Sequence, residues 1–287
     1  MNSKKYLTSD FDYELAKSFI ANSPIDPRDT SKLLVYDSAN NVVQHKHFYD
    51  IVDLLDTKDL IVRNKSKVIA ARIIFQMNGA EKEIFLLKQL SNFRYHVLVE
   101  PGKSFKKGRQ ISLTKGLKCL VEEVLDDGSR IVKFTNKTKE SLDNILDSIG
   151  KTPLPPYIEN KNLDLNHYQT VYADKKGSVA APTAGLHFTK SLTQKLKDKG
   201  VKVEEVILHV GRGTFSPILT DNIEDHKIHS ENLILSNENA KNLNKFKKEN
   251  YKFIDIRTTS VRVLESCYDT VKGFSSYEGE TDIFIYP

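Results

Sequence analysis

The chain has 287 residues, of which 39% are hydrophobic and 28% are charged, and its formal net charge at pH 7 is +5. No run approaches the ~20 consecutive apolar residues of a membrane-spanning helix, and residues 1–20 lack the apolar stretch of a secretory signal, so we expect a cytoplasmic protein without a membrane anchor. The two cysteines, Cys119 and Cys267, do not have the spacing of a disulfide framework, a cysteine zinc site or a dithiol redox motif.

The first 150 residues change character near residue 63. Before that point the pattern predicts a helical stretch over 13–20, a turn-rich segment over 23–29 and strands over 33–37 and 60–62. From 63 to 150, six short β-like runs separated by Gly, Asn and Asp residues predict a small antiparallel β domain, folded as a barrel. Residues 141–150 close this domain as a helix.

Positive charge is concentrated in this β segment. Residues 63–150 contain 17 Lys and Arg against 10 Asp and Glu, a net charge of +7, which leaves about −2 for the rest of the chain. A segment of this kind attracts a polyanion through phosphate contacts. The alternative is the ordinary solvated surface of a lysine-rich protein.

Residues 189–271 alternate between helix and strand. The predicted order is a helix over 189–199, a strand over 201–210, a helix over 236–250, a strand over 251–256 and a helix over 259–271. This alternation predicts an α/β domain. If the β segment is an insertion, residues 1–62 and 151–287 together form one discontinuous α/β domain around a domain of residues 63–150.

Two motifs combine small residues with a histidine. In GSVAAPTAGLHF (177–188), Thr183 and Gly185 lie in a segment whose small side chains let the backbone approach a ligand, and His187 follows. In LHVGRGTFSP (208–217), His209 ends a predicted strand and Gly211 follows, where α/β domains usually display ligand-binding groups. The alternatives are a tightly packed loop in the first motif and a core histidine in the second.

The motif HKIHSE (226–231) combines two histidines with a carboxylate. His226 and His229 are three residues apart, so both imidazoles would share one face of a helix, and Glu231 follows closely. This spacing leaves a metal site, proton transfer and hydrogen bonding as alternatives.

The motif RTTSVR (257–262) begins a predicted helix with hydroxyl side chains. Thr258, Thr259 and Ser260 can bind a carboxylate or phosphate at the positive end of the helix, and the guanidinium of Arg262 can bind an anion in a bidentate manner. Simple capping of the helix is the alternative.

Taken in order, these segments resemble one family, the S-adenosylmethionine:tRNA ribosyltransferase-isomerases of queuosine biosynthesis. The resemblance covers essentially the whole chain and is carried by FDYEL at 11–15, PIDPRD at 24–29, VIAAR at 68–72, PLPPYI at 153–158, YQTVYA at 168–173, GSVAAPTAGLHF, LHVGRGTF, HKIHSE, TTSVR with LES at 264–266, and TDIFIYP at 281–287. It implies a large α/β domain, barrel-like at its core, that is interrupted by a smaller β-barrel domain.

The resemblance also implies a reaction and its participants. The ribosyl group of S-adenosylmethionine, a co-substrate, is transferred to preQ1 at the wobble position of tRNA and rearranged to epoxyqueuosine by a monomer that needs no metal. Candidate groups for proton transfer are His187, His209, His229 and Glu231; candidates for binding S-adenosylmethionine are Thr183, Gly185, Gly211, Thr258, Thr259, Ser260 and Arg262; candidates for binding tRNA are Arg72, Lys103, Lys106, Lys107 and Arg109.

The chain departs from the family pattern in three places. Lys65 stands where the family has Asp or Asn, and Ala70 stands where the family has Pro. Arg257 stands where the family has glycine. The family also continues beyond TDIFIYP, a segment that we expect to be a strand. The last two features favour an alternative, a tRNA-binding remnant with little or no transferase activity. A metal-dependent hydrolase built on His226, His229 and His187 or His209 is the second alternative.

Overall fold

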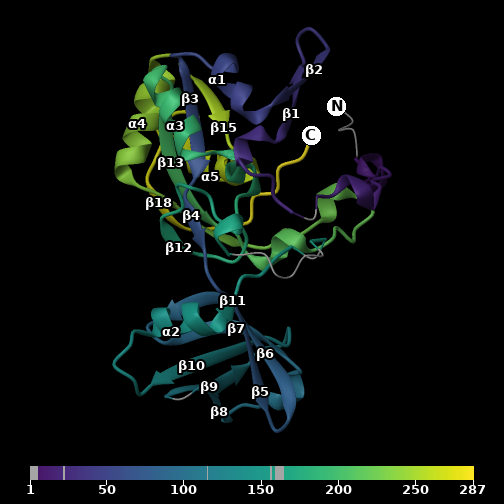
Figure 1. Ribbon diagram of the computed structural model, residues 1–287, viewed down its shortest axis with the longest axis vertical. Coiled ribbons are helices and arrows are strands. Elements are labelled where there is room, and N and C mark those ends of the chain that lie inside the picture. Colours follow the sequence, from purple (N-terminus) through teal and green to yellow (C-terminus); the bar gives the residue numbers. More distant parts are fainter. Residues whose placement is uncertain (1–5, 22, 115, 156, 159–164) are drawn as a thin grey trace. The chain divides into compact units, whose positions relative to one another are not determined.

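The computed structural model describes residues 6–21, 23–114, 116–155, 157–158 and 165–287. The chain forms two compact units (Figure 1). The α/β unit comprises residues 1–67, 155–175 and 181–287, and the β unit comprises residues 68–154 and 176–180. No helix among the described residues has the length and apolar character needed to cross a membrane.

The α/β unit is built on a five-stranded mixed sheet. Its strands, in spatial order, are β15 (Lys252–Asp255), β3 (Asp59–Asn64), β13 (Lys202–His209), β14 (Glu231–Leu235) and β18 (Tyr277–Thr281). The central strand β3 pairs in parallel with both β15 and β13, whereas β14 runs antiparallel to β13 and β18. Every residue of β3 is buried, as expected for a strand covered on both faces.

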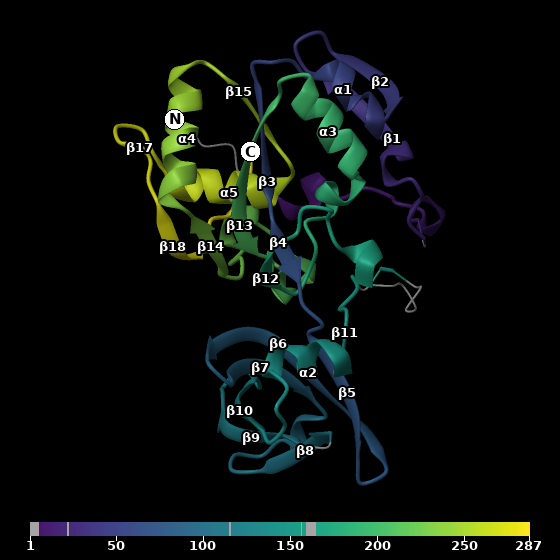
Figure 2. The ribbon, with the colours of Figure 1, turned by 60° about the vertical axis from the view of Figure 1, so that its left-hand side comes forward.

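Helices cover the two faces of this sheet. Figure 2 shows α3 (Lys190–Asp198) on one side of β3, and α4 (Asn237–Lys248) and α5 (Thr258–Cys267) on the other. The predicted helices over 189–199 and 236–250 are confirmed, and each begins at a hydroxyl cap: Thr189 accepts a hydrogen bond from the Leu192 N–H, and Ser236 accepts one from the Asn239 N–H.

The core beneath α3 consists of side chains from distant segments. Ile61 of β3 packs with Phe188, Leu192 and Leu196, and Phe48 meets Phe188 edge-on with ring centroids 5.0 Å apart. The segment that ends in Phe188 is thereby fixed against the sheet.

The remaining elements of the α/β unit are small. They are the hairpin of β1 (Lys32–Asp37) and β2 (Val42–His47), the short helix α1 (Ile51–Leu54), and the strand pair β16 (Tyr268–Asp269) and β17 (Gly273–Phe274). A second pair, β4 (Ser66–Val68) and β12 (Lys175–Ser178), includes residues of both units.

The β unit is a seven-stranded antiparallel sheet with one helix. The strand order is β11 (Gly150–Lys151), β5 (Arg72–Met77), β6 (Ala80–Ser91), β7 (Arg94–Glu100), β10 (Arg130–Asn136), β9 (Leu117–Val124) and β8 (Gln110–Thr114). Helix α2 (Leu142–Ile149) adds Leu142, Ile145 and Leu146 to the core of the sheet. The antiparallel β domain is confirmed, but in the described residues its edge strands β11 and β8 do not pair, so closure into a barrel is not.

The α/β unit also differs from the barrel-like core expected for it. Its five central strands form one open sheet with β15 and β18 at the edges, and its other described strands form two-stranded pairs. Because helices cover both faces, the sheet buries its apolar surface without closing on itself. Strand β3 continues through Asn64 in this sheet, so Arg63 and Asn64 lie in the α/β unit and not in the predicted insert.

Two predicted elements are wrong. The segment 13–20 contains only a 3₁₀ turn, Lys17–Phe19, because Tyr13, Leu15 and Phe19 are exposed and no packing stabilises a short helix there. In the segment 281–287 only Thr281 belongs to a strand. The carbonyl groups of Thr281 and Ile283 instead accept hydrogen bonds from Arg262.

Helix α5 begins at a strained residue. Arg257 has φ 70° and ψ 173°, a region that is essentially restricted to glycine, and its side chain makes no capping bond. The sequence therefore has arginine at a position whose backbone conformation favours glycine, the residue expected there from the family pattern.

We expect Arg257→Gly to raise the free energy of unfolding by about 1 kcal/mol, since relief of ~1–3 kcal/mol of strain outweighs the greater backbone freedom that glycine loses on folding. Urea unfolding followed by circular dichroism measures the change. The matched control is Asn250→Gly, because Asn250 also has a positive φ of 57° but asparagine tolerates it. Equal effects of the two variants would contradict the assignment of strain to Arg257.

Candidate active site

Three sequence motifs of the α/β unit, LHVGRGTF, HKIHSE and RTTSVR, meet at one edge of its sheet. Since β3, β13 and β15 are parallel, Asn64, His209 and Asp255 all lie at carboxyl ends of neighbouring strands. The antiparallel β14 begins at this edge with Glu231, and α5 starts beside it. The side-chain amide of Asn64 joins two of the strands, because it accepts a hydrogen bond from the Leu208 N–H and donates one to the Leu208 carbonyl.

A buried ion pair connects three of the motifs. The guanidinium of Arg262 in α5 binds Oε2 of Glu231, and Oε1 of Glu231 accepts a hydrogen bond of 2.8 Å from the N–H of Gly211. Burial raises the pKa of Glu231, and the bonds from Gly211 and Arg262 oppose this effect. The pair therefore holds the glycine loop after β13, the start of β14 and helix α5 in one arrangement.

The same pair bears on the predicted anion site. Arg262 also donates to the carbonyl groups of Ile283 and Thr281, at 3.2 and 3.1 Å. The structure thus shows Arg262 binding groups of this chain, and the role of Arg262 toward a ligand stays a prediction. Sequence reasoning had placed Glu231 and Arg262 in separate roles, and their pairing has no local signal in the sequence.

The hydroxyl groups at the start of α5 do not cap the helix. The N-cap is Arg257, and Ser260 donates its Oγ–H back to the Ile256 carbonyl at 3.5 Å. Thr258 is exposed, whereas Oγ1 of Thr259 is buried without a hydrogen-bond partner. Simple capping is therefore not what the structure shows for this motif.

His187 has a defined hydrogen bond. Its Nδ1 lies 3.1 Å from Oγ of Ser31, and Ser31 donates its single hydroxyl proton to the Arg28 carbonyl at 2.7 Å. Ser31 Oγ must then accept a hydrogen bond from Nδ1–H, so the neutral ring keeps its lone pair on Nε2. Burial, reinforced by the charge of Arg28, lowers the pKa of His187. The neutral form that a general base requires is therefore favoured.

Residues of the PIDPRD segment hold the His187 segment in place, a role that sequence reasoning missed. Arg28 donates to the carbonyl groups of Gln169 and Asn166, at 2.7 and 2.8 Å, and Asp29 accepts a hydrogen bond of 2.8 Å from the Thr189 hydroxyl. The only sequence feature that could have indicated this role is the adjacent Arg and Asp in a proline-rich turn. Their partners could not be identified from it, because they lie more than 130 positions away in the sequence.

Gly185 serves close packing inside the protein. A Cβ at this position would overlap the hydroxyl group of Tyr172, which burial leaves with a raised pKa. Thr183 is half-buried at the start of the same 3₁₀ helix, Thr183–His187. The small residues do allow a close approach to the backbone, as the sequence predicts, and the group that approaches Gly185 in the structure is the Tyr172 side chain.

His209 ends β13 with an unused nitrogen. Its Nδ1 is buried without a hydrogen-bond partner in the described part of the chain, and burial, with the nearby charge of Lys175, lowers the pKa of the ring. Oδ1 of Asp255, at the end of β15, and Oγ of Ser66, two residues after the end of β3, are likewise buried without a hydrogen-bond partner. Buried polar groups usually have partners, so this edge has capacity to bind a polar ligand.

The two histidines of HKIHSE do not share a helical face, which corrects that expectation. Residues 226–230 lie outside any helix. The side chain of His229 is solvent-exposed and lies beside Gly213, whereas the ring of His226 packs against the ring of Phe284 with centroids 5.2 Å apart. Across the described ranges, no group of three or more His, Cys, Asp or Glu side chains is arranged to hold a metal ion.

The basic candidates of the β unit differ in their availability. Lys103, Lys106 and Lys107 are exposed in the segment between β7 and β8. Arg109 donates to the Ser104 carbonyl at 3.1 Å, and Arg72 forms an ion pair of 2.8 Å with Glu83. The three lysines thus have the geometry for contacts with an external anion.

We expect Arg262→Met to lower the free energy of unfolding by about 3–5 kcal/mol, because it leaves Glu231 buried without its cation. The double variant Arg262→Met with Glu231→Gln should lose much less than the sum of the single losses, as urea unfolding would show. Arg94→Gln, which breaks the exposed pair with Glu122, is the control and should cost at most about 1 kcal/mol. Additive losses for the two buried residues would contradict their coupling.

The family model described as Queuosine biosynthesis protein matches residues 8–287. A protein of Thermosipho melanesiensis named S-adenosylmethionine:tRNA ribosyltransferase-isomerase is 45% identical over 97% of this chain and 82% of its own length. A protein of the same name from Finegoldia magna is 43% identical over 98% of this chain and 81% of its own length.

A crystal structure of S-adenosylmethionine tRNA ribosyltransferase from Thermotoga maritima is also similar, with 32% identity, coverage of 97% of this chain and 79% of that chain, and a TM-score of 0.48. The family match spans the sequence motifs described above, from PIDPRD to the segment after β18. The chain belongs to the queuosine biosynthesis protein family.

Proposed function

We propose that this chain transfers and isomerises the ribosyl group of S-adenosylmethionine onto preQ1 in tRNA, which forms epoxyqueuosine and releases adenine and methionine. The observation that carries the proposal is 45% identity to a ribosyltransferase-isomerase over nearly the whole chain. The fold supports it, because the matching motifs lie on neighbouring strand ends of one sheet, where α/β domains bind ligands.

In this proposal, the half-buried His187 and His209 transfer protons. The reaction needs a base that removes a proton beside the sulfonium and an acid that protonates the departing adenine. His187 is the stronger candidate for the base, since its Nδ1–H is held by Ser31 and Nε2 is free to accept a proton. His209 is the candidate for the second role, with an unpartnered buried nitrogen at the end of β13.

Binding of S-adenosylmethionine, the co-substrate, is assigned to the same edge. The unpartnered Oγ1 of Thr259, with Thr258 and Ser260 at the positive end of α5, suits the methionine carboxylate. Thr183, Gly185 and Gly211 shape the backbone around it. Glu231 and Arg262 act as positioning residues in this proposal, because their ion pair fixes the Gly211 loop. His229, exposed beside Gly213, is a candidate for contact with substrate.

The tRNA substrate is assigned mainly to the β unit. Lys103, Lys106 and Lys107 are exposed on one segment and can neutralise phosphates, with Arg72 and Arg109 as further cations. We further propose a cytoplasmic monomer whose β unit curls toward a barrel. Beyond the departure at Arg257, the described residues offer no observation in favour of the non-catalytic remnant or the metal-dependent hydrolase.

Release of adenine from S-adenosylmethionine in the presence of preQ1-containing tRNA tests the proposal directly. The expected result is release that requires both substrates, with unmodified tRNA that lacks preQ1 as the control. Binding of S-adenosylmethionine or tRNA without any release would favour the non-catalytic alternative.

His187→Ala and His209→Ala should each lower kcat by about 10²- to 10⁴-fold with a smaller effect on binding of S-adenosylmethionine, since general acid–base groups contribute this much. Calorimetry and adenine release measure the two quantities. The control is His45→Ala, because His45 is exposed on β2 and should leave kcat unchanged. Near-normal turnover in both site variants would return these residues to the role of core histidines.

The pH profile of the reaction should reflect the lowered pKa of His187. Because burial lowers the pKa of His187, the base stays neutral to a lower pH than an exposed histidine, and the acidic limb of kcat/KM should lie below the ordinary value of about 6.5. An acidic limb above that value, measured by adenine release between pH 5 and 8, would contradict the assignment of His187 as the base.

Salt should weaken tRNA binding strongly. Each phosphate contact contributes about 0.7–0.9 to the slope of log affinity against log salt concentration. Replacing Lys103, Lys106 and Lys107 with Glu should flatten that slope, which filter binding at several salt concentrations would show. An unchanged slope would contradict the role of this segment.

A further inference from the structure

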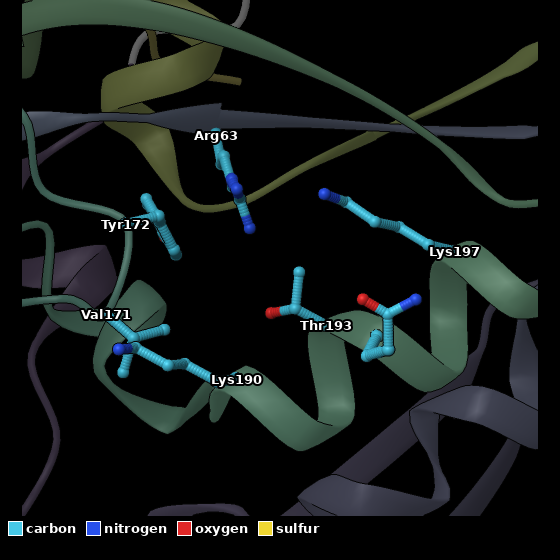
Figure 3. A pocket seen from close by; sticks show the side chains of 7 residues that line it. Arg63, Val171, Tyr172, Lys190, Thr193 and Lys197 are labelled. Carbon is cyan, nitrogen blue, oxygen red and sulfur yellow. The ribbon is translucent and has the colours of Figure 1, made fainter.

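A polar pocket lies on the α3 side of the α/β unit. Its volume is about 200 Å³. The lining combines one side of α3 with residues from β3 and from the chain before β12, namely Arg63, Val171, Tyr172, Lys190, Thr193, Gln194 and Lys197. Figure 3 shows Arg63 directed toward the space between Tyr172 and Lys197, with Thr193 at the centre of the pocket.

Arg63 is fixed as one wall of this pocket. It is only 7% exposed, its Nε and Nη2 donate to Oε1 of Glu205 at 3.2 and 2.7 Å, and its guanidinium lies 3.9 Å from the centroid of the Tyr172 ring. These contacts hold the cation in one place, so that little conformational entropy is lost when an anion binds beside it.

The other two cations are available. Lys190 and Lys197 are exposed, and neither has an ion-pair partner among the residues that the structure describes. The hydroxyl group of Thr193 donates to the Thr189 carbonyl at 2.9 Å, and the amide of Gln194 donates to Asp198 at 2.8 Å. The groups that the pocket offers to a ligand are therefore mainly cationic.

Size and spacing restrict the kind of ligand. Pockets for whole small molecules usually measure ~300–1,000 Å³ and are largely apolar, so this pocket is too small and too polar for a complete nucleoside co-substrate. Lys190 and Lys197 are seven residues apart, which corresponds to about 10.5 Å along the helix axis. Two lysines at this spacing follow an extended polyanion better than they surround one small ion.

We infer that this pocket binds the phosphate backbone of the tRNA substrate, as a contact in addition to the lysines of the β unit. The inference rests on the proposed function, because it takes tRNA as the polyanion. Lys190 and Lys197 supply mobile charges, and Arg63 supplies the fixed one. Such contacts position the nucleic acid without reading its sequence, so they should affect all tRNAs alike.

The test is the double variant Lys190→Gln with Lys197→Gln in the full chain. Filter binding of tRNA at several salt concentrations should show the slope of log affinity against log salt reduced by about 1 to 2, as expected for the loss of up to two phosphate contacts. In adenine release, KM for tRNA should rise while kcat at saturating tRNA is unchanged. Arg63 is left intact because its loss would leave Glu205 without its buried partner.

A matched control exists on α4. Lys241 and Lys248 are also exposed and seven residues apart, so Lys241→Gln with Lys248→Gln removes the same charge at the same spacing. This control should change the slope little, and Lys190→Arg with Lys197→Arg should retain the wild-type slope. Circular dichroism checks that each variant is folded.

The outcomes separate the two proposals. If the wild-type chain binds tRNA and the pocket variant behaves like the α4 control, the inference about the pocket is wrong and the proposed function is unaffected. If the wild-type chain does not bind tRNA at any salt concentration, the proposed function is wrong and the inference fails with it.

Discussion

The parallel pairing of β3 with both β13 and β15 is the constraint on which the α/β unit depends. A strand that is buried over its whole length and paired on both sides fixes the register of its neighbours, since a shift by one residue would turn apolar side chains away from the core. This register brings Asn64, His209 and Asp255 to the same edge. The candidate active site is therefore a consequence of the strand directions.

Buried polar contacts then tie the loops to this frame. Glu231 and Arg262 join β14, α5 and the segment after β18, while Glu204 of β13 accepts hydrogen bonds of 2.6 and 2.9 Å from Asn239 and Asn242 of α4. A buried charge is costly unless it is paired and hydrogen-bonded, so each contact admits few alternative arrangements. The same contacts therefore restrict the conformations of the loops that carry the candidate residues, although these loops are not helices or strands.

The two units divide the work in the proposed reaction. The α/β unit holds the histidines and the polar strand-end groups, and the β unit presents exposed lysines between β7 and β8. The pocket formed by Arg63 and α3 adds cationic groups to the α/β unit. Under the proposals made above, chemistry and tRNA binding overlap on the α/β unit, and the charge excess of the β segment accounts for only part of the affinity.

The sequence by itself determined the class of both units, most of the regular elements and the family motifs. Periodicity is a local signal, which is why the helices predicted over 189–199 and 236–250 begin close to the observed starts of α3 and α4. The helix expected over 13–20 failed because its apolar side chains find no surface to pack against, a fact that no local pattern contains.

Only the tertiary structure decided which motif residues meet. Arg262 is predicted from the sequence to bind an external anion, and only the fold shows that it also pairs with Glu231, 31 positions away in the sequence. Arg28, Ser31 and Arg63 gained their roles from partners more than 130 positions away. Hydrogen bonds and ion pairs between distant segments depend on strand order and helix placement, and residue types alone do not specify these, because one side chain suits many partners.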